Sequence, residues 1–394
     1  MQDLQKITGY MGGLTPSATL AITAKAKALK AEGLDVCSMA AGEPDFDTPK
    51  AVKDACIQAL NESKVYYTPA SGLPELRKLV AKKFTEENNI PCTFEQCVVA
   101  PGAKFSVFSA IAALCGPGDE VIIPAPFWIN YREVVISLGA KPVFIETSPE
   151  NKFVVQPEEI EKAVTPRTRL LVLNSPSNPT GAVIPGEILD RIAETVIKHD
   201  LFVISDEIYN HLVFDGKKAE SILTRPGMRE RTAVVNGFSK RYAMTGWRVG
   251  WTLAPAPMIR VMTQMTENIV ACAPLPSQYA AIEALSDRTD ESYILKEFEK
   301  RRNCVLEELK TIPEITCVGI PATFYGLLNI SKTGMTGEEF AMALLKSKQV
   351  ALIHGSAYGG KAYNDFVRIA FTMDCSLLRQ AFSRIRDFLK ERSL

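Results

Sequence analysis

One lysine stands in a setting that favours covalent chemistry. Lys240 directly follows a short apolar run and lies within the string Asn236-Gly-Phe-Ser-Lys-Arg-Tyr-Ala-Met-Thr-Gly-Trp-Arg248. A lysine at the end of a strand is most often a solvated surface charge, but glycines bracket this one and Arg248 lies eight residues further on. A lysine that bonds a carbonyl compound needs a lowered pKa, and an anionic ligand needs a cation to anchor it. The string therefore predicts covalent catalysis at Lys240.

A carboxylate ends a second apolar run. Asp206 lies in Ile204-Ser-Asp-Glu-Ile-Tyr209. A helix cap and a metal ligand are both ordinary roles for such an aspartate. A metal would need further ligands, but the chain has only three histidines and no cysteine or histidine cluster with zinc spacing, so we expect no metal site. An acidic partner for a pyridinium nitrogen fits Asp206 better, because a carboxylate held there keeps such a ring protonated.

Three further segments supply polar or aromatic groups. The string Asn174-Ser-Pro-Ser-Asn-Pro-Thr-Gly181 is a turn, in which Asn178 either serves the loop alone or presents its amide to a phenolate oxygen. Gly102-Ala103-Lys104 opens a helix after a strand, where backbone N–H groups attract phosphate. Trp128 is either core packing or a flat plate for a planar ring. Neither a P-loop motif nor GxGxxG occurs, so nucleotide binding loses its usual support.

A single arginine interrupts an apolar strand near the C-terminus. Arg368 lies in Phe366-Val-Arg-Ile-Ala-Phe, and the alternation of a strand would bury its side chain. A buried guanidinium group requires a carboxylate partner. That partner is either a structural residue or a substrate, and the sequence leaves both open.

These residues must be positioned by the elements that precede them. Apolar runs of four to six residues indicate strands buried on both faces of a mostly parallel sheet that is covered by helices. The runs begin at Cys97, Glu120, Pro142, Leu170, Phe202, Ala233 and Gly250. Ligands bind beyond the carboxyl ends of such strands, so the polar residues that follow them should gather in one place. Helices are expected at Ala18–Ala31, Pro74–Asn88 and Phe105–Leu114.

The region from about Asp290 has a different pattern. A long charged helix is expected at Tyr293–Lys310, and a closing helix at Ser376–Glu391. The elements expected between them are Phe324–Ile330, Gly337–Ser347, Val350–Ile353 and Phe366–Phe371. We therefore predict an α/β protein in three parts. Residues 1–45 would form an N-terminal arm and helix that pack on the small domain, residues 46–288 a large domain, and residues 289–394 a small α+β domain.

Composition limits the partners and the compartment. The chain of 394 residues has 45 Lys plus Arg and 45 Asp plus Glu, so its zero formal charge gives no reason to expect nucleic acid or an anionic membrane. Nine scattered cysteines without a CxxC pair are expected to be free thiols in a reducing compartment. No signal-peptide core is evident, and no apolar run approaches the roughly 20 residues that span a bilayer. A cytoplasmic protein is the expectation.

Several strings in this order resemble the class I aminotransferases of fold type I, which use pyridoxal phosphate (PLP), and most closely the bacterial aspartate aminotransferases of subgroup Ib. The resemblance covers essentially the whole chain. Besides the strings quoted above, it rests on Thr15–Ala21, Ala41–Pro49, Tyr67–Arg77 and Val367-Arg-Ile. It implies PLP as cofactor, ping-pong transfer of an amino group and a homodimer whose active sites are shared between subunits. The implied fold is a large domain with a seven-stranded, mostly parallel sheet and a smaller α+β domain.

The resemblance implies a role for each matching residue around the cofactor. Lys240 would bond PLP covalently and later carry the proton between the substrate Cα and the cofactor. Asp206 would pair with the pyridine nitrogen, while Asn178 and Tyr209 would bond the phenolate oxygen. The other implied cofactor contacts are Trp128 on the ring and, around the phosphate, Gly102, Ala103, Lys104, Ser239, Arg248 and Tyr67 of the partner subunit.

The implied substrate contacts are Gly42, Lys104, Trp128, Asn178, Arg368 and Ser17. Arg368 would grip the α-carboxylate in a fork, aided by the Gly42 backbone. Lys104 would recognise a distal carboxylate, and Ser17 lies in the matching N-terminal segment. These positions favour transfer from L-aspartate to 2-oxoglutarate, which yields oxaloacetate and L-glutamate.

The chain departs from the subgroup pattern at several positions. Asn268-Ile-Val-Ala-Cys272 replaces a stretch rich in Ser and Thr, Asn130 and Arg132 replace the usual Ser and Pro, and His354 stands where Pro is common. A more apolar pocket would admit aromatic amino acids or prephenate, which is the alternative hypothesis. A PLP β-lyase and a non-enzymatic sensor built on the same fold are the remaining hypotheses.

Overall fold

The central element is a seven-stranded sheet. The structure, a computed structural model, describes residues 9–392, so residues 1–8 of the predicted arm lie outside the described residues, as do residues 393–394. Within the described chain the strands run in the order β2-β8-β7-β6-β5-β3-β4. Their bounds are β2 (Cys97–Ala100), β3 (Glu120–Ala125), β4 (Lys141–Glu146), β5 (Thr168–Asn174), β6 (Phe202–Asp206), β7 (Thr232–Gly237) and β8 (Gly250–Leu253). Of these seven strands β8 alone runs opposite to the other six, so the predicted mostly parallel sheet is confirmed.

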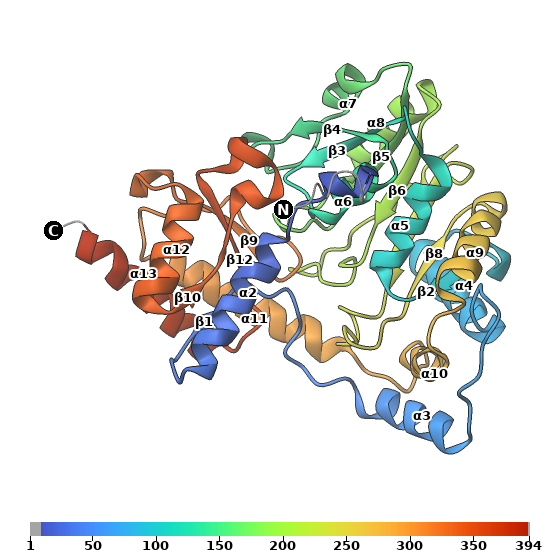
Figure 1. The fold of residues 1–394 in the computed structure, drawn as a ribbon, viewed down its shortest axis with the longest axis horizontal. Coiled ribbons are helices and arrows are strands. Elements are labelled where there is room, and N and C mark those ends of the chain that lie inside the picture. The colour runs from blue at the N-terminus through green and yellow to red at the C-terminus, as the bar shows by residue number, and fades with distance from the viewer. Residues whose placement is uncertain (1–8, 393–394) are drawn as a thin grey trace.

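Helices cover both faces of this sheet (Figure 1). Their bounds are α3 (Lys50–Asn61), α4 (Pro74–Asn88), α5 (Ala103–Leu114), α6 (Asn130–Ser137), α7 (Pro157–Ala163), α8 (Gly186–Lys198), α9 (Ala256–Val270) and α10 (Leu275–Ala284). Amphipathic spacing drives this packing, as in α8, where Leu189, Ile192 and Val196 share one buried face. Central strands contribute the other side of the core, because their residues are buried on both faces.

Register brings the strand ends together. Asn174 at the end of β5 pairs with Asp206 at the end of β6, and Gly237 of β7 pairs with Gly250 of β8. A Cβ atom on Gly250 would lie 2.5 Å from the backbone nitrogen of Ala103, so only glycine lets the start of α5 pack this closely. The sheet therefore delivers the polar residues of four strands and one helix start to a single edge.

Three details differ from the sequence-based expectations. The β4 strand is not buried on both faces: it is the edge of the sheet, and Phe144 is 44% exposed. The helix expected from Phe105 begins at Ala103, because Gly102 serves as its N-cap with φ 86°. The single strand expected at Val350–Ile353 is two short strands in different sheets, since Leu352 interrupts the pairing.

The C-terminal region, residues 292–392, is an α+β unit beside the large sheet (Figure 1). Its elements are α11 (Ser292–Leu309), β9 (Tyr325–Asn329), α12 (Gly337–Lys348), β10 (Val350–Ala351), β11 (Ile353–His354), β12 (Phe366–Ala370) and α13 (Cys375–Arg392). The order β11-β12-β9 is an antiparallel sheet. Short 3-10 helices complete the described chain: η1 (Gly9–Gly13), η2 (Phe94–Gln96), η3 (Pro149–Asn151), η4 (Ile222–Thr224), η5 (Ser331–Thr333), η6 (Gly355–Tyr358) and η7 (Gly360–Tyr363).

The N-terminal segment contacts both parts of the molecule. Helix α2 (Ala18–Ala31) buries Ile22 and Ala26 in a cluster with Ile353 of β11, and β1 (Cys37–Ser38) pairs with β10. Before the helix, the Thr15 hydroxyl donates to Glu133 of α6 at 2.8 Å. The segment thus bridges the C-terminal region and the large sheet. The division at residues 45 and 288 stays a prediction.

Chemical properties of the described chain complete this picture. Between residues 9 and 392 no helix is both long enough and apolar enough to cross a membrane. The same residues include no group of three or more His, Cys, Asp or Glu side chains arranged to hold a metal ion. All nine cysteines are free thiols.

Candidate active site

The lysine amine lies in a desolvated position after β7. Lys240 Nζ donates a hydrogen bond to the carbonyl oxygen of Gly42 at 2.7 Å and lies 5.6 Å from the centre of the Phe324 ring. Burial lowers the pKa of Lys240 to about 8. The positive charge of Arg248 lowers this pKa further, whereas the negative charge of Glu43 raises it. A useful fraction of the side chain is therefore a neutral amine near pH 8, and only the neutral amine is a nucleophile.

The acidic group at the end of β6 is almost fully enclosed. Asp206 is 4% exposed, and burial raises the pKa of its carboxyl group to about 6. Two hydrogen bonds oppose that rise: the Tyr131 hydroxyl donates to Oδ2 at 2.6 Å, and the Ile208 backbone N–H donates to Oδ1 at 3.2 Å. Asn174 Nδ2 donates to the Asp206 backbone carbonyl at 3.0 Å, which ties the two strand ends together. The carboxyl group is thus held at a fixed place and lacks an ion pair within the described chain.

Tyr209 follows in the turn after β6 and meets a second tyrosine. Its hydroxyl donates to the Tyr325 hydroxyl at 3.3 Å, and the two rings pack edge to face with centroids 5.8 Å apart. Burial raises the pKa of both phenols, so each remains a neutral hydrogen-bonding group. Tyr209 can therefore donate a hydrogen bond to a nearby anion while it stays neutral.

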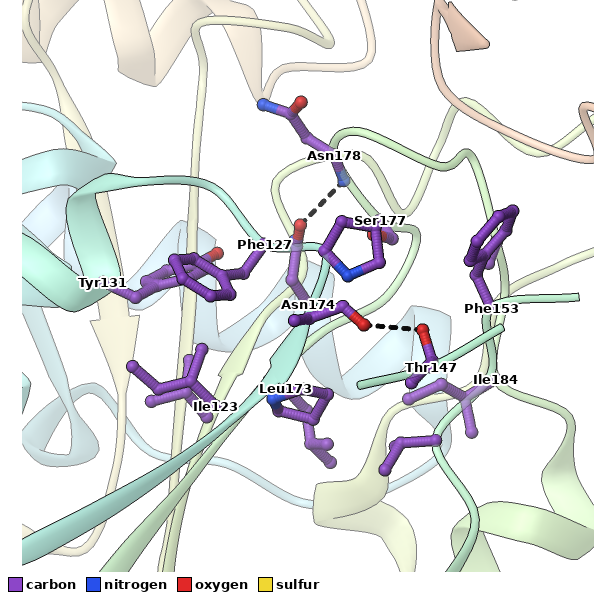
Figure 2. A pocket seen from close by; sticks show the side chains of 16 residues that line it. Ile123, Phe127, Tyr131, Thr147, Phe153, Leu173, Asn174, Ser177, Asn178 and Ile184 are labelled. Atoms are coloured by element: carbon purple, nitrogen blue, oxygen red, sulfur yellow. Dashed lines mark hydrogen bonds between the residues drawn. The ribbon is translucent and has the colours of Figure 1, made fainter. Parts of the chain in front are cut away.

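Asn178 and Arg368 meet across the two parts of the chain. Asn174 Oδ1 accepts the Asn178 backbone N–H at 2.9 Å, and Figure 2 shows that this bond leaves the Asn178 amide directed away from Asn174. Arg368 Nη1 donates to Asn178 Oδ1 at 3.4 Å, while Nη2 donates to the Ala40 carbonyl. The guanidinium carbon lies 4.5 Å from the centre of the Tyr325 ring. Nε of this buried arginine has no hydrogen-bond partner among residues 9–392, which leaves a donor available for an anion.

A cradle for an anion lies where α5 begins. Gly102 caps the helix, and a Cβ atom at this position would lie 2.5 Å from Arg248 Nη2. Arg248 takes a left-handed backbone conformation (φ 52°), a strain that is typical of functional sites. Its Nη1 donates to the Thr245 carbonyl at 2.9 Å, which fixes the guanidinium group beside the helix start. The Gly102 N–H donates to the Ala100 carbonyl at 2.6 Å, so the groups at this helix start that suit a phosphate are the N–H groups of Ala103 and Lys104, together with the Arg248 cation.

Lys104 and Trp128 lie next to each other. Lys104 Nζ is 5.4 Å from the centre of the Trp128 ring, and the Trp128 ring packs edge to face on Tyr131 at 5.3 Å. Loss of solvent around the ammonium group and the charge of Arg248 lower the pKa of Lys104. The indole is half-buried, as a plate that borders a cavity would be.

Three residues that the sequence predicted for the site are not seen to contact the site residues described above. The Ser17 hydroxyl accepts the Leu20 N–H at 3.3 Å, so it caps α2. Tyr67 is 86% exposed and lies outside the cluster within a single chain. Ser239 is buried beside Lys240 in the sequence, without a described hydrogen bond that defines its role.

Sequence reasoning missed two tyrosines of the cluster. Tyr131 lies on α6, three residues after Trp128, and that spacing is the one feature that could have indicated a shared face. Tyr325 begins the apolar strand β9, where an aromatic residue indicates ordinary core packing. Both are recognisable only once distant elements are in place.

The residues fit PLP on three observations. A desolvated amine at Lys240 suits its aldehyde, an enclosed carboxyl group at Asp206 suits its ring nitrogen, and the Gly102 cradle beside Arg248 suits its phosphate. A small cavity of about 40 Å³ borders Tyr131 and Asn178 (Figure 2), but Lys240, Asp206 and Arg248 do not line it, so it is separate from the proposed cofactor position. These groups derive from elements that the parallel sheet brings to one edge.

Comparisons with known proteins agree. Residues 35–385 match the family model of aminotransferase class I and II. The aspartate aminotransferase of Geobacillus stearothermophilus is 39% identical, over 98% of this chain and 100% of that protein. The aspartate/prephenate aminotransferase of Thermus thermophilus is 37% identical, over 94% and 95% of the two chains. A structure of Thermus thermophilus aspartate aminotransferase with maleate superposes with a TM-score of 0.92 at 37% identity, over 98% of this chain and 99% of that one. The chain therefore belongs to the class I and II aminotransferase family and is a PLP-dependent transaminase.

Proposed function

We propose that this enzyme transfers the amino group of L-aspartate to 2-oxoglutarate and so produces oxaloacetate and L-glutamate in a ping-pong reaction. One observation carries the proposal: Arg368 and Lys104 form no ion pair with any residue from 9 to 392. A four- or five-carbon dicarboxylate has one carboxylate for each of these cations. The names of several relatives, aspartate aminotransferase among them, support the same substrate.

The two cations would divide the substrate between them. Arg368 is fixed by Asn178, Ala40 and the Tyr325 ring, so its guanidinium group is oriented before substrate arrives. We assign it the carboxylate next to the reacting carbon. Lys104 lies over the Trp128 ring, and we assign it the distal carboxylate. Gly42 would support the first carboxylate through its backbone, and Ser17 lies at the start of α2.

The proposed chemistry centres on three residues. PLP, when bound, supplies an electron sink that weakens a bond at the substrate Cα. Lys240 would hold the cofactor covalently and, once released, move the proton at the substrate Cα. Asp206 would hold the proton on the ring nitrogen. Tyr209, with Asn178, would donate hydrogen bonds to the phenolate oxygen, which the neutral state of its buried phenol permits.

The remaining proposed contacts hold the cofactor in place. Trp128 would stack on the ring, because it already packs against Tyr131 beside Asp206. The phosphate would sit on the N–H groups of Ala103 and Lys104, near Gly102 and Arg248, with Ser239 as a further donor.

We also propose that two copies of the chain share their active sites. Val65, Tyr66 and Tyr67 form an exposed apolar stretch, and Ile269 at the end of α9 is exposed as well. Apolar surface of this kind is typical of an interface. Tyr67 of the partner subunit would then reach the phosphate. The free cysteines support a reducing, cytoplasmic compartment.

A second candidate function is transamination of aromatic amino acids or prephenate. It is favoured by Ile269 and Val270, which are exposed and apolar where the subgroup has Ser and Thr. Some relatives are also named aspartate/prephenate aminotransferases. This alternative is not better supported than aspartate, because the relatives carry both names. An aromatic amino acid would leave Lys104 without an anionic partner, whereas prephenate has a second carboxylate for it.

A coupled assay tests the proposal. Purified enzyme with PLP, aspartate and 2-oxoglutarate should release oxaloacetate, which malate dehydrogenase converts with loss of NADH absorbance. Ranking kcat/KM for aspartate, phenylalanine and prephenate then decides between the two candidates. Turnover with other amino donors but none with aspartate would overturn the first.

A further inference from the structure

The carboxyl group of Asp206 depends on a neighbour that lies on another element. It is enclosed at the end of β6, and within the described chain no cation bonds it. Among residues 9–392 its one side-chain donor is the Tyr131 hydroxyl, which reaches Oδ2 from α6 at 2.6 Å. A hydrogen bond to an ionised acceptor is among the strong ones in proteins, and more so in an enclosed site.

The surroundings of Asp206 leave this bond as the main local support for a negative charge. Lys240 faces it from the segment after β7 and attracts the carboxylate at longer range. Tyr209 follows it in the same turn as a neutral phenol. The side chain of Glu207, next in sequence, accepts hydrogen bonds from the Ser205 and Ser221 hydroxyls. Without the tyrosine, the Ile208 N–H would be the one remaining hydrogen-bond donor to the carboxyl group from the described part of the chain.

We propose that Tyr131 is a positioning residue for the cofactor: its hydroxyl holds Asp206 ionised and fixed in orientation, so that the carboxylate can pair with the protonated pyridine nitrogen. This inference rests on the proposed role of Asp206. The residue acts through Asp206 and does not itself touch the reacting atoms.

The geometry of α6 supports this role. The Tyr131 ring packs edge to face on Trp128, which we propose as the plate beneath the cofactor ring. One short helix therefore sets both the plate and the donor to the carboxylate. A phenol suits the position, because burial and the charge of Asp206 raise its pKa and keep it a donor at every physiological pH. It supports the carboxylate without adding a positive charge that would repel a pyridinium.

The test is equilibrium binding of PLP to the apoenzyme of Tyr131→Phe across pH 5 to 9, followed by quenching of tryptophan fluorescence. The substitution removes one hydroxyl and keeps the ring packing. We expect the dissociation constant at neutral pH to rise about 10- to 100-fold. We also expect the loss of affinity on acidification to begin at a higher pH than in the wild type, since Asp206 without its donor takes up a proton more readily.

A PLP analogue with C–H in place of the ring nitrogen separates positioning from packing. It cannot pair with Asp206, so Tyr131→Phe and the wild type should bind it within about threefold of each other. Tyr363→Phe is the matched control: its buried hydroxyl bonds the Ala125 and Thr147 carbonyls, so its removal should leave PLP affinity and its pH profile unchanged.

The Tyr131→Phe and Asp206→Ala variants together distinguish the role of Tyr131 from that of Asp206. Unchanged PLP affinity and pH profile in Tyr131→Phe, with a large loss in Asp206→Ala, would overturn the role of Tyr131 and leave that of Asp206 intact. An equal loss for PLP and for the carbon analogue would show a packing role and overturn the inference too. Wild-type binding by Asp206→Ala would overturn the proposed role of Asp206 itself.

Discussion

Replacing Arg368 by lysine tests whether this residue reads the carboxylate next to the reacting carbon. The arginine is 2% exposed, and its two Nη atoms bond Asn178 and Ala40 while its planar face stacks on Tyr325. A lysine keeps the charge but offers a single point donor in place of a planar fork. The variant therefore loses the planar, two-pronged hydrogen bonding to a carboxylate and keeps the positive charge.

The magnitude follows from the contacts that are lost. One hydrogen bond to a charged group contributes about 1.5–3 kcal/mol, and a stacked cation contributes about 0.5–2 kcal/mol. Partial compensation by the lysine charge leaves a loss of about 2–3 kcal/mol, which is about a 30- to 150-fold fall in kcat/KM. The fall should be similar for aspartate and for 2-oxoglutarate, because both substrates carry this carboxylate.

The assay follows each half-reaction separately through the absorbance of the bound cofactor. Arg302→Lys is a matched control, since Arg302 is also buried (6% exposed) but pairs with Asp215 at 2.6 Å and stacks on Phe214. We expect that control to lower the melting temperature and to leave kcat/KM within about twofold. A change below threefold in Arg368→Lys with full cofactor content, or a loss confined to one half-reaction, would refute the reasoning.

Three further predictions concern other parts of the site. Lys104→Ala should lower kcat/KM for aspartate about 10- to 100-fold and change that for phenylalanine by less than about threefold; equal losses for both would remove its assigned role. The rate at which apoenzyme bonds PLP, measured by stopped-flow absorbance, should rise about tenfold per pH unit up to about pH 8 and then level off, because burial lowers the pKa of Lys240 to that value and only the neutral amine attacks. A rate independent of pH below 7 would contradict this. Tyr67→Phe should weaken PLP binding about tenfold in the dimer, by loss of one hydrogen bond to phosphate, as equilibrium dialysis would show; unchanged affinity would argue against a shared site.

The strand-end residues could be predicted from sequence because local patterns place them. Lys240 and Asp206 each follow a short apolar run, and parallel strands of a covered sheet end at one edge. Register then completes the arrangement, since Asn174 pairs directly with Asp206. The family resemblance assigned roles to these strand-end residues, and it alone indicated Gly42, Ser17 and Tyr67.

Other features depend on tertiary contacts and stayed hidden. Tyr131 and Tyr325 are buried aromatic residues in apolar elements, so nothing local separates them from core packing. The exposure of Phe144 follows from the edge position of β4, which the order of strands decides and the sequence of one strand does not. Tyr67 is exposed in a single chain, and its proposed role requires a second copy.

The most direct test of the central claim is the site of covalent attachment. The enzyme is loaded with PLP, reduced with borohydride, digested, and its peptides are identified by mass spectrometry. The proposed chemistry predicts one modified residue, Lys240, whose amine has a pKa lowered to about 8 beside Gly42. Label on any other lysine, or undiminished label in Lys240→Ala, would contradict it.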